Sequence, residues 1–115
     1  MPLLSLQTNL TIETAQKQTL LTTLSQMTAK ILSKPESYVM ISIQSETSMI
    51  FAGSEDPLAY VELKSLGLPE DQTGEISTTI CQTIKQQLDI DPARVYIEFN
   101  SGERHMWGWN NKTFG

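Results

Sequence analysis

The sequence contains one cysteine, Cys81, among its 115 residues. A single thiol excludes an internal disulfide and any Cys-x-x-Cys redox or zinc site. No apolar run approaches the roughly 20 residues that a membrane-spanning helix requires. The first residues also lack the basic region and long apolar stretch of a secretory signal peptide. We therefore expect a soluble, cytoplasmic protein with no membrane partner, for which any export would be non-classical.

Positive charge and histidine are also scarce. The chain has 8 Lys and Arg against 13 Asp and Glu, which gives a net charge of −5, and its basic residues do not cluster. Nucleic acids require a basic face for their phosphates, so we exclude a nucleic-acid partner. The one histidine, His105, has no evident partner for acid–base catalysis, and neither a metal-ligand spacing nor a phosphate-binding loop is present. The sequence therefore predicts no metal and no cofactor.

A proline follows the initiator methionine directly. Methionine is generally removed before a small residue, and its removal would leave Pro2 as the amino terminus with a secondary-amine nitrogen. An α-amino group has a pKa of about 8, and burial in an apolar pocket lowers that pKa because it disfavours the charged form. A neutral amine can act as a general base or as a nucleophile. The alternative is that Pro2 only fixes φ ahead of a strand, and its position alone favours this alternative.

Two segments have the apolar spacing of amphipathic helices. The first would be capped by Thr11 and ended by Pro35, and its apolar stripe consists of Leu20, Leu24, Met27 and Ile31. The second is ended by Pro92, and its stripe consists of Ile76, Ile80, Ile84 and Leu88. Cys81 lies on this second stripe, and we expect it to be packed in the core.

Strand-like runs surround both helices. The longer runs are residues 3–7, 38–44, 58–66 and 93–100, and the shorter ones are 48–53 and 105–110. The order of strand, helix, strand and short strand therefore occurs twice. An offset of 57 aligns the two halves and places Pro35 on Pro92. We interpret residues 1–115 as a single domain with an internal repeat, roughly 2–53 and 59–110.

Two β-α-β units in one chain predict an α/β (α+β) fold with a four-stranded mixed sheet, both helices on one face, and short edge strands. We also expect apolar residues on the uncovered face, because either Leu4 and Leu6 or Leu3 and Ser5 must point away from the helices. An exposed apolar face needs a partner, and the two short runs could pair with the sheet edge of a neighbour. The sequence therefore predicts an oligomer whose sheets pack together.

Several motifs are distributed over the whole chain. They are MP at the start, SKPESYV, FAGSEDP, KSLG, DPARVYI and, as the most specific of them, GWNNKTFG at the end. With these motifs the sequence resembles the macrophage migration inhibitory factor (MIF) family, within the tautomerase superfamily. The resemblance implies a homotrimer in which each subunit is a pseudo-twofold pair of β-α-β units. This agrees with the offset found between the two halves.

The resemblance also implies a cofactor-independent isomerase of the phenylpyruvate tautomerase type. In this family the amino-terminal proline, in a pocket at the subunit interface, moves a proton between carbon and oxygen in phenylpyruvate, dopachrome-like compounds or other enolisable carboxylates. Here Pro2 would be the general base and Lys34 would bind the substrate carboxylate. The other substrate-binding positions would be Tyr38, Ser65, Leu66, Tyr96 from the adjacent subunit, Glu98, Trp109 and Phe114. A lysine beside the proline would lower the pKa of its amine and stabilise an enolate.

The sequence departs from the family pattern at three places. Leu58 and Val61 stand where some members have a Cys-x-x-Cys, which excludes a thiol–disulfide activity through that motif. Glu98 replaces an asparagine. Its carboxylate would repel an anionic substrate, raise the pKa of the proline amine, or pair with a cation such as Arg104. Trp107 is bulkier than the aliphatic residue expected there. The alternative function is a binding or cytokine-like signalling protein with a vestigial pocket.

Overall fold

The computed structural model describes residues 1–115, and its main strands and helices follow the predicted order. The strands are β1 (Leu3–Thr8), β2 (Met40–Gln44), β3 (Ala59–Leu66), β4 (Val95–Gly102), β5 (Gly108–Trp109) and β6 (Lys112–Thr113). The helices are α1 (Thr14–Ile31) and α2 (Thr73–Leu88). The short 3₁₀ helices are η1 (Glu36–Tyr38), η2 (Glu70–Gln72), η3 (Pro92–Arg94) and η4 (Arg104–Met106).

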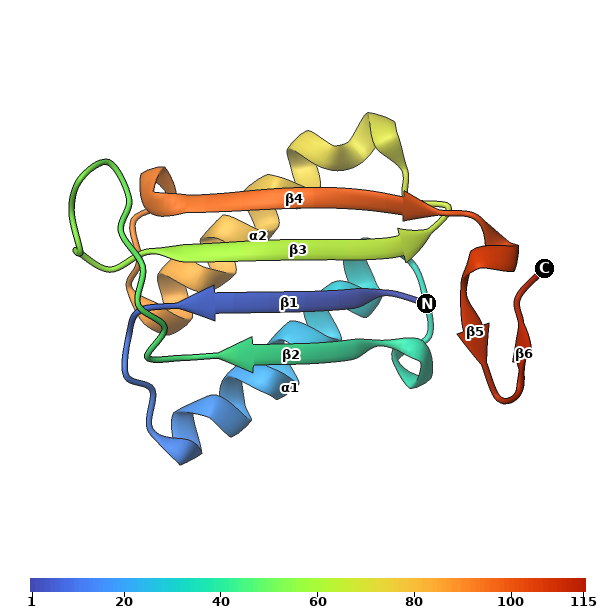
Figure 1. Ribbon diagram of the computed structural model, residues 1–115, viewed down its shortest axis with the longest axis horizontal. Coiled ribbons are helices and arrows are strands. Elements are labelled where there is room, and N and C mark those ends of the chain that lie inside the picture. The colour runs from blue at the N-terminus through green and yellow to red at the C-terminus, as the bar shows by residue number, and fades with distance from the viewer.

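The four long strands form one sheet in the order β2-β1-β3-β4 (Figure 1). Strands β1 and β2 are parallel, and so are β3 and β4, whereas β1 and β3 are antiparallel. A helix connects the two strands of each parallel pair, so each pair forms one β-α-β unit. The predicted fold, two such units in a mixed sheet, is therefore confirmed.

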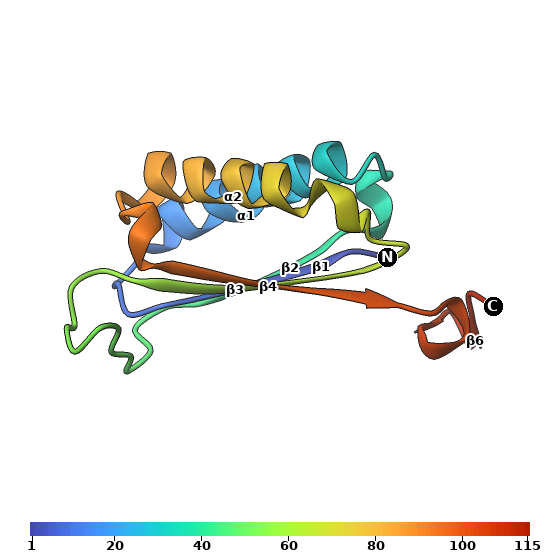
Figure 2. The same ribbon diagram turned by 90° about the horizontal axis from the view of Figure 1, so that it is seen from above.

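Both helices cover the same face of the sheet (Figure 2), and this packing buries the apolar stripes predicted for them. Leu20 and Leu24 of α1 and Ile80 and Ile84 of α2 are fully buried in one hydrophobic core. In β1 the buried side chains are Leu4, Leu6 and Thr8. Neither helix is both long enough and apolar enough to cross a membrane.

Helix α1 begins later than the sequence suggests. Its first residue is Thr14 and its N-cap residue is Glu13, so the prediction of Thr11 as the N-cap is wrong. The physical reason is the burial of Ile12, which is 5% exposed and belongs to the core. With Ile12 anchored in the core, Glu13 keeps an extended backbone conformation and the helix starts after it.

The first short run, residues 48–53, forms no strand, so this prediction is wrong. Its only pairing is an isolated bridge between Phe51 and Ser54. Ala52 and Gly53 both have positive φ angles, 53° and 73°, and these angles turn the chain back on itself.

The second short run, residues 105–110, lies mostly in η4 and β5. Strand β5 pairs with β6 of the same chain. The two residues between these strands, Asn110 and Asn111, have φ angles of 53° and 63°. Two consecutive positive φ angles are typical of the type I′ turn, which asparagine tolerates well. The C-terminal segment is therefore a hairpin fixed by its own turn.

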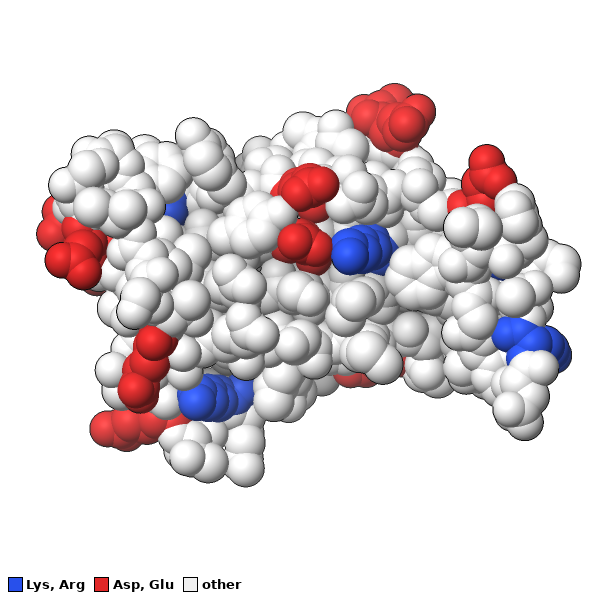
Figure 3. All heavy atoms as spheres, viewed as in Figure 1, with Lys and Arg blue, Asp and Glu red and all other residues white.

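The uncovered face of the sheet is mostly polar, but it carries some apolar side chains as the alternation predicted, because Leu3 and the exposed Met40 lie on it. Strand alternation turns Leu4 and Leu6 toward the helices, and the register places Ser5 between Ser42 and Glu62. Glu62 is in turn aligned with Glu98 of β4 and forms an ion pair with Lys64 at 3.4 Å. Figure 3 shows this face, with acidic side chains next to a basic one near the middle of the sheet.

Candidate active site

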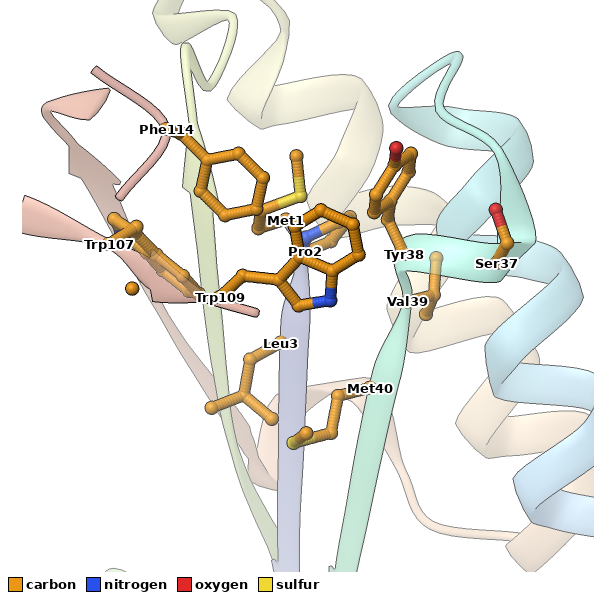
Figure 4. Close-up of a pocket in the computed structure, with 11 residues that line it drawn as sticks. Met1, Pro2, Leu3, Ser37, Tyr38, Val39, Met40, Trp107, Trp109 and Phe114 are labelled. Carbon is orange, nitrogen blue, oxygen red and sulfur yellow. The ribbon is translucent and has the colours of Figure 1, made fainter. Parts of the chain in front are cut away.

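A cavity of about 220 Å³ lies at the end of the sheet where both β1 and β2 begin. Three segments surround it: the amino terminus, the turn from η1 into β2, and the C-terminal hairpin (Figure 4). The lining residues are Met1, Pro2, Leu3, Ser37, Tyr38, Val39, Met40, Trp107, Gly108, Trp109 and Phe114. Eight of these eleven residues are hydrophobic, so the cavity is an apolar site beside the amino terminus.

Pro2 is buried and lines the cavity. It is less than 2% exposed, and its carbonyl accepts a hydrogen bond from the Met40 backbone N–H at 3.0 Å. This bond fixes the start of β1 relative to β2. With Met1 in place, the Pro2 nitrogen is part of a peptide bond, and the Met1 side chain itself lines the cavity.

The surroundings of the amino terminus disfavour positive charge. The pKa of the Met1 amine is lowered from its ordinary value, mainly because the amine is partly buried and secondarily because Lys34 repels its charge. Removal of Met1 would move the free amine one residue inward, to the more deeply buried Pro2. Burial would therefore favour the neutral form of an amine at Pro2, and the positive charge of Lys34 lies close by.

The end of α1 positions Lys34 for this role. Ser33 has a φ angle of 52°, and the Lys34 backbone N–H donates to the Ala29 carbonyl at 2.9 Å. The Ser33 N–H donates to the Lys30 carbonyl at 3.2 Å, which completes a Schellman motif. Glycine is the usual sequence signal for this motif, and the position with positive φ is here a serine, Ser33. Lys34 is thus held by backbone geometry at the point where the chain leaves the helix toward the cavity.

Aromatic rings form one wall of the cavity. The rings of Tyr38 and Trp109 meet edge to face with centroids 5.8 Å apart, and those of Trp109 and Phe114 are stacked at 5.7 Å. The Lys112 ammonium lies 5.7 Å from the Trp109 ring centroid. The Phe114 carbonyl accepts a hydrogen bond from Arg104 Nε at 2.9 Å, which anchors the chain end. Such a wall suits a planar aromatic ligand.

The structure brings some of the predicted site residues together and leaves others apart. Pro2, Tyr38, Trp109 and Phe114 line the cavity, and Lys34 acts on the amino terminus through its charge. Ser65 and Leu66 do not line it. They are buried at the end of β3, at 0% and 5% exposure, and the Ser65 hydroxyl donates to the Leu66 carbonyl. The lining residues that were not predicted from the sequence as site residues are Met1, Leu3, Ser37, Val39, Met40, Trp107 and Gly108.

Tyr96 and Glu98 also lie outside the cavity of their own chain. Tyr96 is 65% exposed near the start of β4, at the opposite end of the sheet, where its ring contacts that of Phe51 at 4.8 Å. Glu98 accepts a hydrogen bond from the Tyr60 hydroxyl at 2.6 Å, and this bond lowers the pKa of the Glu98 carboxyl. Arg104, suggested as a partner of Glu98, instead donates to the Phe114 carbonyl.

Comparisons with known proteins identify the family to which the chain belongs. The family model described as "Macrophage migration inhibitory factor (MIF)" matches residues 1–115. The chain therefore belongs to the MIF family, whose members are part of the tautomerase superfamily.

Individual relatives cover the same length. The macrophage migration inhibitory factor of Xenopus tropicalis is 34% identical over 99% of each chain, and a homolog from Brugia malayi is 34% identical over 100% of each. The crystal structure of a homologue from Prochlorococcus marinus superimposes with a TM-score of 0.92 at 40% identity, and covers 98% of this chain and 99% of that one. Membership of this family is consistent with a tautomerase-like or a cytokine-like function.

Proposed function

We propose that this protein is a cofactor-independent keto–enol tautomerase that uses Pro2, exposed by removal of Met1, as its general base. Its substrates are phenylpyruvate-like or dopachrome-like enolisable carboxylates. The observation that carries this proposal is the position of Pro2, less than 2% exposed beside an aromatic-lined cavity and next to the charge of Lys34. A terminal proline used only to fix φ would not require a cavity, an aromatic wall and a nearby cation together.

The reaction follows from the chemistry of these groups. The neutral Pro2 nitrogen takes a proton from the carbon next to the keto group, and the C–H electron pair becomes the C=C bond of an enolate. The enolate oxygen then takes this proton from the Pro2 ammonium, so that one proton has moved from carbon to oxygen and the neutral amine is restored. Lys34 binds the carboxylate and stabilises the negative charge that develops on the enolate. The rings of Tyr38, Trp109 and Phe114 hold the aryl group and exclude water.

We further propose that the site is completed in a homotrimer. Tyr96 and Glu98 are exposed and remote from the cavity of their own chain, and the sheet face beside them is uncovered. A neighbouring copy that brings its Tyr96 to the cavity would supply the missing wall. Light scattering is expected to give a mass of three chains, whereas a monomer that turns over substrate would contradict this part of the proposal.

The assay that tests the function uses protein shown by mass spectrometry to lack Met1. We expect it to convert phenylpyruvate between keto and enol forms, followed by the ultraviolet absorbance of the enol. A correctly trimmed, folded protein that is inert toward phenylpyruvate, a dopachrome-type substrate and other enolisable keto acids would contradict the enzyme. That result would instead favour the cytokine-like function, which the names of the relatives support.

Replacement of Lys34 tests the cation separately from the base. We expect Lys34→Met to raise KM for phenylpyruvate by about 10-fold or more, because hydrogen bonds to charged groups contribute roughly 1.5–3 kcal/mol. The pKa of the Pro2 amine should rise without the neighbouring positive charge, and only the neutral amine is active. The rising limb of kcat/KM against pH should therefore move to higher pH. Lys30→Met, on the same helix end, is the control and should leave both KM and the pH profile unchanged.

A further inference from the structure

One arginine side chain organises the loop between β2 and β3, at the end of the sheet opposite the cavity (Figure 1). The guanidinium of Arg94 donates hydrogen bonds to four backbone carbonyls of this loop. They are the carbonyls of Phe51 at 3.2 Å, Ser54 at 2.9 Å, Asp56 at 3.0 Å and Pro57 at 3.0 Å. A guanidinium has its N–H donors in one rigid plane, so this single residue holds all four carbonyls in one arrangement.

The same guanidinium also holds a tight turn in the loop. The backbones of Phe51 and Ser54 pair with each other, and the turn between them places Ala52 at a φ angle of 53°. A left-handed conformation is unfavourable for a residue with a side chain, so the turn needs support from outside. Arg94 directly precedes β4 and lies over the Phe51 ring, 5.3 Å from its centroid. It therefore ties this turn to the start of β4.

The Phe51 ring in turn supports Tyr96. The two rings meet edge to face, with centroids 4.8 Å apart and an angle of 61° between their planes. Tyr96 is otherwise largely exposed, and the loop lies on the side of the sheet that the helices leave uncovered (Figure 2). Arg94 thus fixes Phe51, and Phe51 restrains the ring of Tyr96.

We propose that Arg94 is a positioning residue, which holds Phe51 against Tyr96 and so fixes the ring that Tyr96 presents to the cavity of a neighbouring subunit. This inference rests on the proposed trimeric site, in which Tyr96 completes the wall of that cavity. An exposed ring without support moves among several rotamers. A ligand that needs one of these rotamers then loses affinity, because the ring must be ordered on binding.

The test measures binding as well as turnover, on the trimmed full-length chain. Benzoylformate is an aryl keto acid with no hydrogen on the carbon next to its keto group, so it can bind but cannot enolise. The chain has three tyrosines, so labelling with fluorotyrosine gives three ¹⁹F signals, which Tyr→Phe variants assign. Protein that binds benzoylformate but does not turn over phenylpyruvate would contradict the tautomerase and leave this inference standing.

We expect benzoylformate to shift the Tyr96 signal of the wild-type protein. Arg94→Met should change the Tyr96 signal before any ligand is added. It should also weaken benzoylformate binding by about threefold to tenfold, the range that one aromatic contact contributes. KM for phenylpyruvate should rise by the same factor with little change in kcat, because the Pro2 amine and Lys34 are untouched.

Two further variants make the same test without removing the whole arginine side chain. Phe51→Leu keeps the backbone carbonyl that Arg94 holds but removes the ring that contacts Tyr96, so it should weaken binding as Arg94→Met does. Arg94→Lys keeps the charge, but an ammonium cannot hold four carbonyls in one plane, so it should not restore binding. These variants decide the question if Arg94→Met does not fold.

A double variant shows whether Arg94 acts through Tyr96. Tyr96→Ala alone should weaken benzoylformate binding. Adding Arg94→Met to it should change binding by less than about twofold, because two residues that act through one contact are not additive. A general loss of loop stability would give no such coupling.

The stability control is Asn9→Ala. The Asn9 side chain donates to the Glu55 carbonyl at 2.8 Å and accepts from the Leu58 N–H at 3.0 Å, so it holds the same loop at a distance from Phe51. Loss of these bonds should lower the temperature of thermal unfolding. Benzoylformate binding and the Tyr96 signal should stay as in the wild type.

Four results would overturn the inference. One is an Arg94→Met protein with the wild-type Tyr96 signal and affinity. Another is a loss of affinity from Arg94→Met that is equally large in the Tyr96→Ala protein. The third is an Asn9→Ala protein that binds as weakly as Arg94→Met, since binding would then follow loop stability alone. The last is a wild-type protein whose Tyr96 signal does not respond to benzoylformate, which would place Tyr96 outside the site.

Discussion

Replacement of Pro2 by glycine is expected to lower kcat/KM of the trimmed protein for phenylpyruvate by about 10²- to 10⁴-fold, the usual contribution of a positioned general base. Glycine leaves a terminal amine, but a primary one on a flexible residue, so the nitrogen loses the fixed direction that the proline ring gives it. The loss should appear mainly in kcat, because the aromatic wall and Lys34 still bind the substrate. Steady-state kinetics on protein of verified terminal sequence measures both constants.

A control must separate the lost base from lost packing, since Pro2 is buried. Val39→Ala removes apolar contact from the same cavity without touching the amine, and should reduce kcat/KM far less. Thermal unfolding of both variants shows whether either has lost the fold. A folded Pro2→Gly protein that keeps kcat within about threefold of wild type would remove Pro2 from the mechanism.

Retention of Met1 is expected to have an effect at least as large. An amide nitrogen has no available electron pair, so Met1–Pro2 has no base at this position, and the Met1 side chain also occupies part of the cavity. A chain that carries a removable extension before Pro2 should therefore be inactive, and cleavage that leaves Pro2 at the terminus should restore activity by about 10²-fold or more. The same sample before and after cleavage forms the matched pair.

The extension experiment also separates two explanations of inactivity. If the uncleaved protein turns over phenylpyruvate as fast as the cleaved one, the free amine is not the base. If neither form is active although the cleaved terminus is confirmed by mass spectrometry, the cavity is a binding site and not a tautomerase site.

Much of the fold could be predicted from the sequence because its signals are periodic and occur twice. The stripes that include Leu20 and Ile80 indicated both helices, and the offset between Pro35 and Pro92 indicated two similar units. The polarity of the uncovered face could not be predicted in the same way. Residues 3 and 4 are both leucine, so alternation alone does not show whether Leu3 or Leu4 faces the helices. Only the packing of the sheet decides this.

Local conformations of the backbone explain the other differences. The turn at Asn110 and Asn111 and the left-handed Ser33 fix the hairpin and the position of Lys34. None of these residues is glycine, so their identity predicts a positive φ angle only weakly. The Trp107 indole occupies the space where a side chain at position 102 would lie. This contact could not be predicted from the sequence, because it depends on atoms that meet only in three dimensions. The roles of Tyr96 and Glu98 in substrate binding remain predictions, because neither residue lines the cavity of its own chain.

The proposed mechanism requires the Pro2 amine to be neutral at physiological pH. It is tested most directly by NMR titration of the trimmed protein with ¹⁵N-labelled proline, in which the terminal nitrogen reports its own protonation. Burial of Pro2 and the charge of Lys34 predict a pKa below the ordinary α-amino value of about 8. In Lys34→Met this lowered pKa should rise toward the ordinary value. A pKa at or above the ordinary value, unchanged by loss of Lys34, would contradict the account.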